Sequence, residues 1–303
     1  YVMKLFSPEK LYKHFIRDNY DIIVSYLEGP TARIVSGCNN PNTKLVSWIH
    51  IEQHTKELAS KSFRSYKEAL DCYSKFDRTV CVSDTVKDDF ESIFDTKKSV
   101  EVLYNTNESE KIKKLSDEQV DDVDFSKDTI NIISVAKIVP SKGYDRLMKI
   151  HKKLIEKNIK NHIYILGIGE EKEKYEKYLA ENNLTDTFTF LGYRDNPYKY
   201  VKKADLYVCS SRREGFSTAV TEALIVGTPV VSTNCSGAYE LLGKNNEYGI
   251  VTENNEDALY EGIKKMLTTP DLLDAYAAKA KERGKAFSTE KTVKAVEEML
   301  SAL

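Results

Sequence analysis

The stretch "ADLYVCSSRREGFSTAVTEALIVGTPVVST", residues 204–233, contains the pattern from which the fold is inferred. Its first apolar run, 204–211, ends in a polar loop, and a helix-like segment begins near Phe216. Glycine is common at helix C-termini, so Gly227 favours the end of the helix there, and Pro229 prevents the helix from continuing into the next apolar run. The stretch therefore predicts a strand, a helix and a second strand, the repeating unit of parallel sheets covered by helices.

The same alternation continues along the chain in two series. Expected strands cover residues 20–27, 43–50, 78–84 and 99–105, and then 129–137, 161–167, 188–192, 204–211, 228–233 and 248–253. Expected helices include 55–76, 143–158, 170–183, 257–267 and an amphipathic helix near 289–303. We therefore predict an α/β chain with two doubly wound parallel sheets of the Rossmann-like kind. Ligands of such sheets bind outside the carboxyl ends of the strands.

An acidic segment separates the two series. Residues 108–128, "ESEKIKKLSDEQVDDVDFSKD", have an excess of acid and a weak apolar pattern, which is typical of a connection between domains. We predict a first domain over 1–107 together with the helix near 289–303, a linker over 108–128, and a second domain over 129–288.

Composition narrows the function classes. The 303 residues, 41% of them hydrophobic, are enough for a large core and favour two domains. A formal net charge of −2 gives no global field that would recruit nucleic acid, so we expect no nucleic-acid partner. Five scattered cysteines without CxxC spacing favour reduced thiols and a cytoplasmic location. No apolar run approaches the roughly 20 residues of a membrane-spanning helix.

Two carboxylates flank the start of the helix in the opening stretch. Glu214 precedes it and Glu222 lies inside it, while Gly215, Ser217 and Thr218 provide close backbone approach and small polar side chains. The free N–H groups of a first turn can bind a diphosphate, and carboxylates roughly 12 Å apart along a helix could accept hydrogen bonds from sugar and ribose hydroxyls. Alternatively, Glu214 stabilises the helix dipole and Glu222 is solvated. Spacing alone leaves both interpretations open.

A second stretch, "VAKIVPSKGYDRL" at 135–147, supplies positive charge. Lys137 and Lys142 flank a turn that contains Pro140 and Gly143. Both ammonium groups could neutralise a diphosphate, and fixed cations stabilise the charge that builds on a leaving phosphate. The alternative is that both lysines are solvated loop residues.

The two stretches, in this order, resemble the donor half of retaining GT-B glycosyltransferases of glycosyltransferase family four. The glutamates resemble that family's E-x7-E motif, and "HIYILGIGEEKEKYEKYLAE", "FTFLGYRDN", "YGIVTENNEDAL" and "FSTEKTV" resemble further family segments. The resemblance implies two Rossmann-like domains that face a cleft. It also implies transfer, with retention, of a hexose-type sugar from a nucleotide diphosphate sugar, with UDP favoured, to a hydroxyl acceptor. A bacterial surface-polysaccharide or lipid-linked glycan intermediate is the implied acceptor.

The resemblance also implies residue roles. Lys142 corresponds to the diphosphate-binding lysine, and Lys137 stands where arginine is usual, which keeps the charge but loses a bidentate grip. Glu214 would contact the donor sugar and Glu222 the ribose. The remaining implied contacts are the backbone of Gly215, Phe216, Ser217 and Thr218 with sugar and phosphate, the backbone near Tyr193 and Arg194 with the base, and His50 with the donor sugar. The alternative for His50 is a histidine that caps a strand end.

Further expectations follow from the same resemblance. No metal or other cofactor is needed, because Lys137, Lys142 and the helix N-terminus supply the positive field. Peripheral association with the inner face of a membrane would fit a lipid-linked acceptor. The family's opening strand and glycine-rich loop have no counterpart before Tyr20, so we predict an incomplete first domain. A non-catalytic partner subunit and a sugar-nucleotide epimerase remain the alternative functions.

Two other patterns are weak. Gly167 and Gly169 follow a strand as in a dinucleotide fingerprint, but Lys172 occupies the third glycine position. His50 and His54 have the spacing of a zinc-binding helix, but the first histidine is followed by Ile51 instead of glutamate. We expect neither a dehydrogenase nor a metal site.

Overall fold

The computed structural model describes residues 2–126 and 128–303, and for Val2 only the backbone. The chain divides into two compact units, Tyr1–Asn105 with Val293–Leu303 (unit 1) and Thr106–Thr292 (unit 2). Tyr1 of the expected first domain and Lys127 of the expected linker lie outside the described residues.

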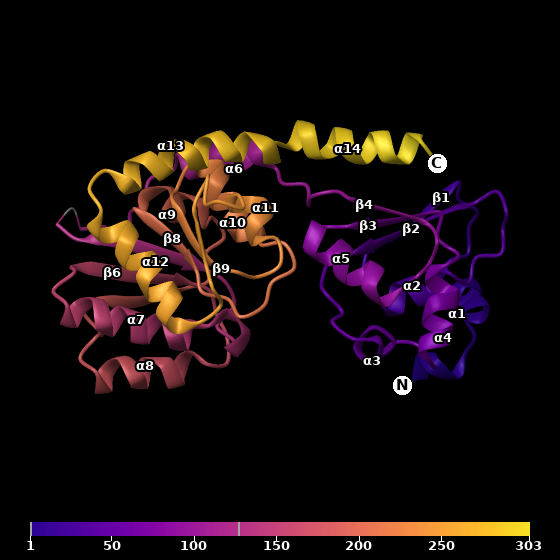
Figure 1. Ribbon diagram of the computed structural model, residues 1–303, viewed down its shortest axis with the longest axis horizontal. Helices are drawn as coiled ribbons and strands as arrows, with labels where there is room; N and C mark the ends of the chain where they lie inside the picture. Colours follow the sequence, from indigo (N-terminus) through magenta and orange to yellow (C-terminus); the bar gives the residue numbers. More distant parts are fainter. Residues whose placement is uncertain (1, 127) are drawn as a thin grey trace. The chain divides into compact units, whose positions relative to one another are not determined.

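Unit 1 contains a parallel sheet in the order β1-β2-β3-β4. Its elements are η1 (Val2–Leu5), α1 (Pro8–Phe15), β1 (Ile22–Ser25), α2 (Pro30–Val35), β2 (Lys44–Ile49), α3 (Lys56–Ala59), α4 (Tyr66–Tyr73), β3 (Arg78–Cys81), α5 (Asp84–Ile93) and β4 (Ser99–Val102). Because consecutive strands are neighbours, right-handed crossovers place the connecting helices on one face of this sheet. Figure 1 shows α2, α4 and α5 on that face.

Unit 2 contains a parallel sheet in the order β10-β9-β8-β5-β6-β7. Its elements are α6 (Ser109–Ser116), β5 (Ile130–Val135), η2 (Pro140–Lys142), α7 (Tyr144–Glu156), β6 (Asn161–Leu166), α8 (Lys172–Glu181), β7 (Phe188–Gly192), α9 (Tyr198–Lys203), β8 (Leu206–Cys209), α10 (Thr218–Val226), β9 (Val230–Thr233), α11 (Ala238–Leu242), β10 (Ile250–Thr252), α12 (Glu256–Thr268), α13 (Leu272–Gly284) and η3 (Lys285–Phe287). Helix α14 (Thr289–Ser301) begins in unit 2 and ends in unit 1.

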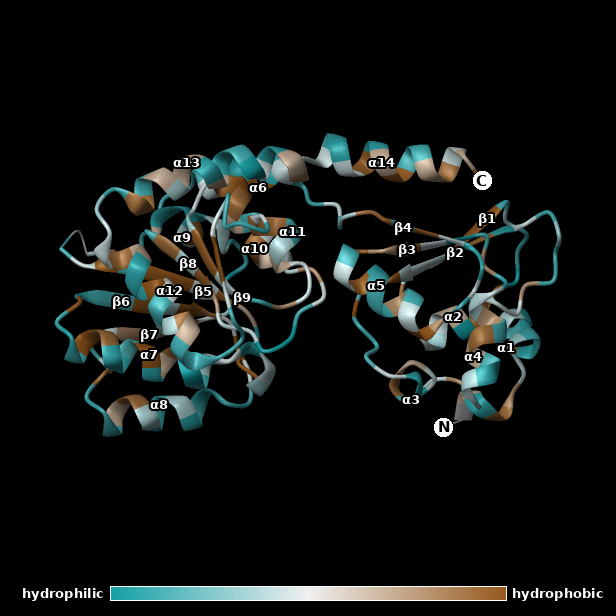
Figure 2. Cartoon of the chain, in the orientation of Figure 1, coloured by the Kyte–Doolittle hydropathy of each residue, from teal (hydrophilic) through white to brown (hydrophobic). Residues whose placement is uncertain are grey.

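The strand order of unit 2 reverses direction between β5 and β8. Figure 1 shows α7, α8 and α12 on one face of the sheet and α9, α10 and α13 on the other. Strands β5 and β8 are hydrophobic while the outer faces of α7 and α8 are polar (Figure 2), and the core fills the space between the strands and α7, α8 and α12. Helix α10 is apolar nearly all round because it packs against α6, α9 and α13.

Every stretch that the sequence predicts to be a strand contains one, and the two-sheet α/β fold class is confirmed. The helix expected over 55–76 is wrong in detail, because α3 and α4 are separated. Ser65 accepts a hydrogen bond from the backbone N–H of Glu68 and so starts a new helix, and the Arg64 guanidinium binds the carbonyls of Lys4 and Leu5. Local side-chain bonds of this kind compete with helix continuation.

The segment 108–128 differs from the expected linker. It contains α6, which packs on α9 and α10 within unit 2. Its acidic residues are matched by basic residues of α9 and of the preceding loop, as in the ion pairs Asp117–Lys202 and Asp122–Arg194. The excess of acid therefore reflects a basic partner surface and not a solvated connection.

Candidate functional site

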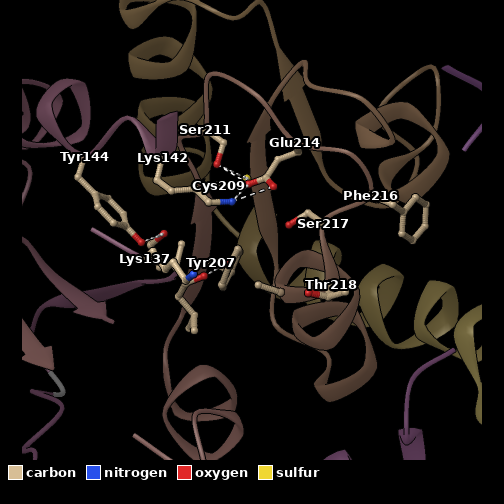
Figure 3. A pocket seen from close by; sticks show the side chains of 14 residues that line it. Lys137, Lys142, Tyr144, Tyr207, Cys209, Ser211, Glu214, Phe216, Ser217 and Thr218 are labelled. Carbon is tan, nitrogen blue, oxygen red and sulfur yellow. Dashed lines mark hydrogen bonds and ion pairs between the residues drawn. The ribbon is translucent and has the colours of Figure 1, made fainter. Parts of the chain in front are cut away.

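A pocket of about 290 Å³ lies at the carboxyl ends of β5 and β8, where the strand order of unit 2 reverses. Open α/β sheets bind their ligands at this place, because the connections leave the sheet in opposite directions. Its lining comes from the end of β5 and the turn after it, from β8 and its following loop, and from the start of α10. Figure 3 shows Lys137, Lys142, Glu214, Ser217 and Thr218 around this pocket.

The turn after β5 packs tightly against the loop after β8. Gly143 has φ +69°, and a Cβ at this position would lie 2.1 Å from the carbonyl oxygen of Ser210. The Ser210 hydroxyl donates to the carbonyl of Lys142 at 2.8 Å. Only glycine fits the backbone conformation and the close approach, so the turn delivers Lys142 to a fixed position beside the second loop.

Two arginines fasten the same pair of loops, and the sequence analysis missed both. Arg146 is buried and donates from Nε to the carbonyl of Ser210 at 2.8 Å and from Nη2 to that of Ser211 at 2.6 Å. Arg212 binds both carboxylate oxygens of Asp145 at 2.7 Å and also the carbonyl of Pro140. Their position in the sequence could have indicated them, because each arginine lies within four residues of a candidate lysine or glutamate.

Lys142 and Glu214 are in direct contact inside the pocket. The Lys142 Nζ lies 2.7 Å from Oε1 and 2.9 Å from Oε2 of Glu214, and the Ser211 hydroxyl donates to the same carboxylate at 2.5 Å. The side chains are 24% and 14% exposed. The structure thus brings together the two residues that the sequence singled out most strongly, and the alternative of a solvated Lys142 is wrong.

Lys137 also lines the pocket, but its side chain is exposed. No hydrogen-bond or ion-pair partner of this ammonium is found within residues 2–126 and 128–303. The charge of Lys142 is compensated by Glu214, whereas that of Lys137 is available to an anion.

The start of α10 forms another wall of the pocket. Ser217 caps the helix by accepting from the N–H of Val220, and Thr218 begins the first turn. Backbone N–H groups in a first helical turn lack intrahelical acceptors and favour anions. Phe216 is buried and packs edge-on against Phe287 with ring centroids 6.0 Å apart. This contact fixes the loop that carries Gly215 next to the pocket.

Glu222 is on α10 but is not among the residues that line this pocket. Burial raises its pKa to about 7, and the Tyr198 hydroxyl, 3.4 Å from Oε1, lowers the pKa in part. The alternative of a solvated Glu222 is therefore wrong. A carboxyl that titrates near neutrality is a typical property of a functional site.

Tyr193 and Arg194 follow β7 at the same edge of the sheet. The Tyr193 side chain is 66% exposed, and Arg194 forms an ion pair with Asp122. Neither residue lines the pocket at β5 and β8.

His50 belongs to unit 1, where it follows β2. It is half-buried, its backbone N–H donates to Glu28 at 2.9 Å, and its ring lies 5.0 Å from that of Tyr26. Burial lowers the pKa of His50, and the nearby Glu28 carboxylate opposes this effect in part.

The two weak patterns have structural explanations. Cβ atoms at Gly167 and Gly169 would lie about 2 Å from the carbonyl oxygens of Ala136 and Ile138, so both glycines serve close packing of neighbouring strand ends. His54 lies with Glu52 and Asp89 in a group whose ligand atoms are all within 4.8 Å of one another, close enough to hold a metal ion. The carboxylate of Asp89 accepts hydrogen bonds from the backbone N–H groups of Gln53 and His54. These bonds give Asp89 a structural role in this turn.

Comparison with known proteins agrees with this geometry. The family model of glycosyl transferases group 1 matches residues 116–283. A Campylobacter jejuni enzyme, N-acetylgalactosamine-N,N'-diacetylbacillosaminyl-diphospho-undecaprenol 4-alpha-N-acetylgalactosaminyltransferase, is 31% identical over 89% of this chain and 70% of its own length. The solved structure of Anabaena HepE with UDP has a TM-score of 0.77 at 17% identity, over 98% of this chain and 81% of that one. A Staphylococcus aureus TarM mutant, bound to fondaparinux, alpha-GlcNAc-glycerol and UDP, has a TM-score of 0.72 at 20% identity, over 94% of this chain and 57% of that one.

The fold is therefore GT-B, with two Rossmann-like parallel sheets. The chain belongs to the family of glycosyl transferases group 1 and is a transferase. No helix among the described residues is both long and apolar enough to span a membrane.

Proposed function

We propose that this chain transfers a hexose-type sugar from a nucleoside diphosphate sugar, with UDP favoured, to a hydroxyl of a glycan or lipid-linked acceptor, with retention of configuration. The observation that carries the proposal is the contact between Lys142 and Glu214 in a pocket that also contains the unpaired charge of Lys137. Relatives support the substrate classes. Anabaena HepE and TarM are bound to UDP, and the Campylobacter enzyme is named for an undecaprenyl diphosphate-linked acceptor and an alpha linkage.

The donor diphosphate would lie between the two lysines and the start of α10. Lys137 offers an uncompensated ammonium, and Lys142 can turn one N–H from Glu214 to a phosphate oxygen, because an ammonium has three donors. Negative charge grows on the diphosphate as the glycosidic bond breaks, so both cations stabilise the transition state more than the ground state. In this proposal they provide the charge that a metal ion would otherwise supply, and no cofactor takes part.

The carboxylates and backbone groups would read the rest of the donor. Glu214 would accept a hydrogen bond from a sugar hydroxyl and Glu222 from the ribose, while the backbone of residues 215–218 contacts sugar and phosphate. The backbone near Tyr193 and Arg194 would lie close to the base, and His50 of unit 1 near the sugar. Attack would occur on the face from which the diphosphate departs, and the leaving phosphate would accept the acceptor's proton.

A lipid-linked acceptor would place the reaction at a membrane surface. We propose peripheral association with the inner face of the membrane, with the chain in the cytoplasm. The five free cysteines are compatible with a reducing compartment.

Thermal unfolding with a panel of nucleotides and nucleotide sugars tests the proposal. A ligand at 100 times its Kd stabilises the native state by about 2.7 kcal/mol, so the matching nucleotide raises the Tm by several degrees. The Lys142→Ala variant is expected to lose this shift. The configuration of the glycosidic bond in the product, measured by NMR, tests retention, and activity in EDTA tests the absence of a metal requirement. A wild-type chain that no nucleotide stabilises would contradict the proposal.

A further inference from the structure

The acidic segment after α6 is attached along its length to the loop between β7 and α9 and to α9 itself. We call residues 117–126 the strap. Lys202 forms an ion pair with Asp117, Lys199 donates to the carbonyl of Gln119 at 2.8 Å, and Asn196 donates to Glu118 at 2.9 Å. Phe125 anchors the far end, with its ring 4.8 Å from that of Tyr164. The strap is therefore a fixed part of unit 2.

The best-formed contacts of the strap converge on Asp122. Its carboxylate accepts from the Tyr200 hydroxyl at 2.7 and 2.9 Å and from Nε of Arg194 at 3.0 Å. Arg194 Nε also lies 3.2 Å from the Tyr200 oxygen, which closes a triangle of three groups. The hydrogen bond from Tyr200 is the first cause of a lowered pKa of Asp122. Exposed ion pairs contribute little to folding stability, so this geometry points to a positional role.

Arg194 passes this constraint to Tyr193. The loop leaves β7 at Gly192, which has φ +73°, and Arg194 Nη1 donates to the Tyr193 carbonyl at 3.1 Å. The Asp122 carboxylate thus holds the Arg194 guanidinium, and the guanidinium holds the Tyr193 backbone. These bonds hold the backbone that carries the exposed Tyr193 side chain.

Tyr193 lies just past β7, beside the end of β6. A hydrogen bond from Gly167 N–H to the Gly192 carbonyl at 2.9 Å joins the two backbones there, and an exposed apolar side chain follows each of these glycines. Ile168 is 61% and Tyr193 is 66% exposed. Strand β7 is two strands from β5, roughly 10 Å, which is similar to the reach of a nucleotide from its diphosphate to its base. An aromatic ring at this distance suits the π-face of a base.

We propose that Asp122, acting through Arg194 and Tyr200, is a positioning residue that holds the backbone of Tyr193, so that the Tyr193 ring forms the surface on which the donor's base lies. The inference rests on the proposed function, because it assumes a nucleotide in the pocket at β5 and β8. It gives the strap a role in the choice of nucleotide, although no strap residue touches the donor.

The test compares the affinity of the full chain for UDP and for pyrophosphate, which lacks the base, by calorimetry. Asp122→Ala and Tyr193→Ala are expected to weaken UDP binding about 10-fold, within the range of base–aromatic stacking, and to leave pyrophosphate binding unchanged. Tyr193→Phe keeps the ring and is expected to retain UDP affinity. Asp117→Ala removes the other ion pair of the strap and is the matched control, with both affinities unchanged.

Two results would overturn the inference alone. The first is a Tyr193→Ala variant that binds UDP as tightly as the wild-type chain does. Because the Tyr193 side chain is exposed, its removal is not expected to unfold the protein, so a loss of UDP affinity in this variant reports on binding. The second is an Asp122→Ala variant that loses UDP affinity and pyrophosphate affinity equally. The Tyr200→Phe variant, which keeps the buried ring but removes the hydroxyl bound to Asp122, allows the same comparison of the two affinities. A wild-type chain that binds no nucleotide would instead overturn the proposed function, and this inference with it.

Discussion

The ammonium of Lys142 lies 2.7 and 2.9 Å from the two carboxylate oxygens of Glu214, and this contact joins loops that are 72 residues apart in the sequence. Both side chains are mostly buried. Removing one partner therefore leaves the other as a poorly solvated charge without compensation. The pair is at once a structural link between the two loops and the centre of the proposed donor site.

Substitution of either partner is expected to abolish most transfer. Lys142→Ala removes a cation from the developing negative charge, and the expected loss of kcat is about 100-fold or more, as for other groups that stabilise transition-state charge. Glu214→Gln keeps the shape of the side chain but removes the charge that orients Lys142, so we expect it to lower kcat as well. The measurement is the initial rate of sugar transfer at saturating donor.

Lys160→Ala is the matched control for Lys142→Ala. Lys160 is an exposed lysine of unit 2 that precedes β6, so it lies at the opposite edge of the sheet. Its variant is expected to keep wild-type rates. Equal rates for the Lys142→Ala and Lys160→Ala variants would show that the pocket is not the donor site.

Lys137 is a position where a substitution is expected to increase the affinity for UDP. Its ammonium is exposed and lines the pocket, and the family resemblance of the sequence implies an arginine at this position. Arginine binds phosphate oxygens in pairs, so Lys137→Arg is expected to tighten UDP binding a few-fold, and Lys137→Ala to weaken it. Calorimetric titration with UDP measures both. Unchanged affinity in both variants would remove Lys137 from the site.

The sequence was sufficient for the sheets because their signal is local. Each strand of unit 2 is a short run that contains β-branched or aromatic residues, and the order of these runs and the charged helices predicts a doubly wound topology. Lys142 and Glu214 could be assigned to one site from sequence because both follow strands, and the carboxyl ends of parallel strands meet at one edge. Their direct contact at 2.7 Å was not predicted.

The parts that could not be predicted depend on partners distant in sequence. The strap resembles a linker by composition, since nothing local shows that Asp122 meets Arg194 and Tyr200, which follow more than 70 residues later. In the sequence, nothing distinguishes Arg146 from other helix residues, because its partners, the carbonyls of Ser210 and Ser211, lie more than 60 residues away. Buried polar contacts of this kind are decided by tertiary packing and leave no periodic signal.

Donor binding is expected to depend on pH through Glu222. Its pKa is about 7 because it is buried, and the ionised form is the better acceptor for ribose hydroxyls. Affinity for the donor should therefore rise as the pH increases through about 7. A nucleotide sugar is the right probe, because its diphosphate is esterified at both ends and does not titrate in this range. Glu222→Gln is expected to bind more weakly and to lose the pH dependence, and a persistent dependence would assign it to another group.

The same carboxyl should also affect stability. Its pKa is raised from 4.5 to about 7 on folding, so between these values the native state binds more protons than the unfolded state, and stability falls as the pH rises. The shift corresponds to about 3 kcal/mol of the free energy of unfolding. This contribution is present below pH 4.5 and is fully lost above pH 7. Glu222→Gln should thus match the wild type near pH 4.5 and exceed its Tm by roughly 5 °C at pH 8. Equal Tm values at pH 8 would show that Glu222 is not buried as described.

Gly143 provides the last prediction, because two separate reasons require glycine there. Any side chain is strained at φ +69°, and a Cβ would also lie 2.1 Å from the carbonyl oxygen of Ser210. Gly192 shares the positive φ, but a Cβ there would meet nothing closer than 3.9 Å. Gly192→Ala should therefore cost about 1–2 kcal/mol of folding stability, the strain alone, whereas Gly143→Ala should cost clearly more. Because the clash separates the loops that carry Lys142 and Glu214, Gly143→Ala should also lower the rate of transfer by more than its loss of folded protein. Urea unfolding and initial rates, measured on both variants, check the two parts. Equal destabilisation would mean that the loops are less tightly packed than the hydrogen bond from Ser210 to Lys142 indicates.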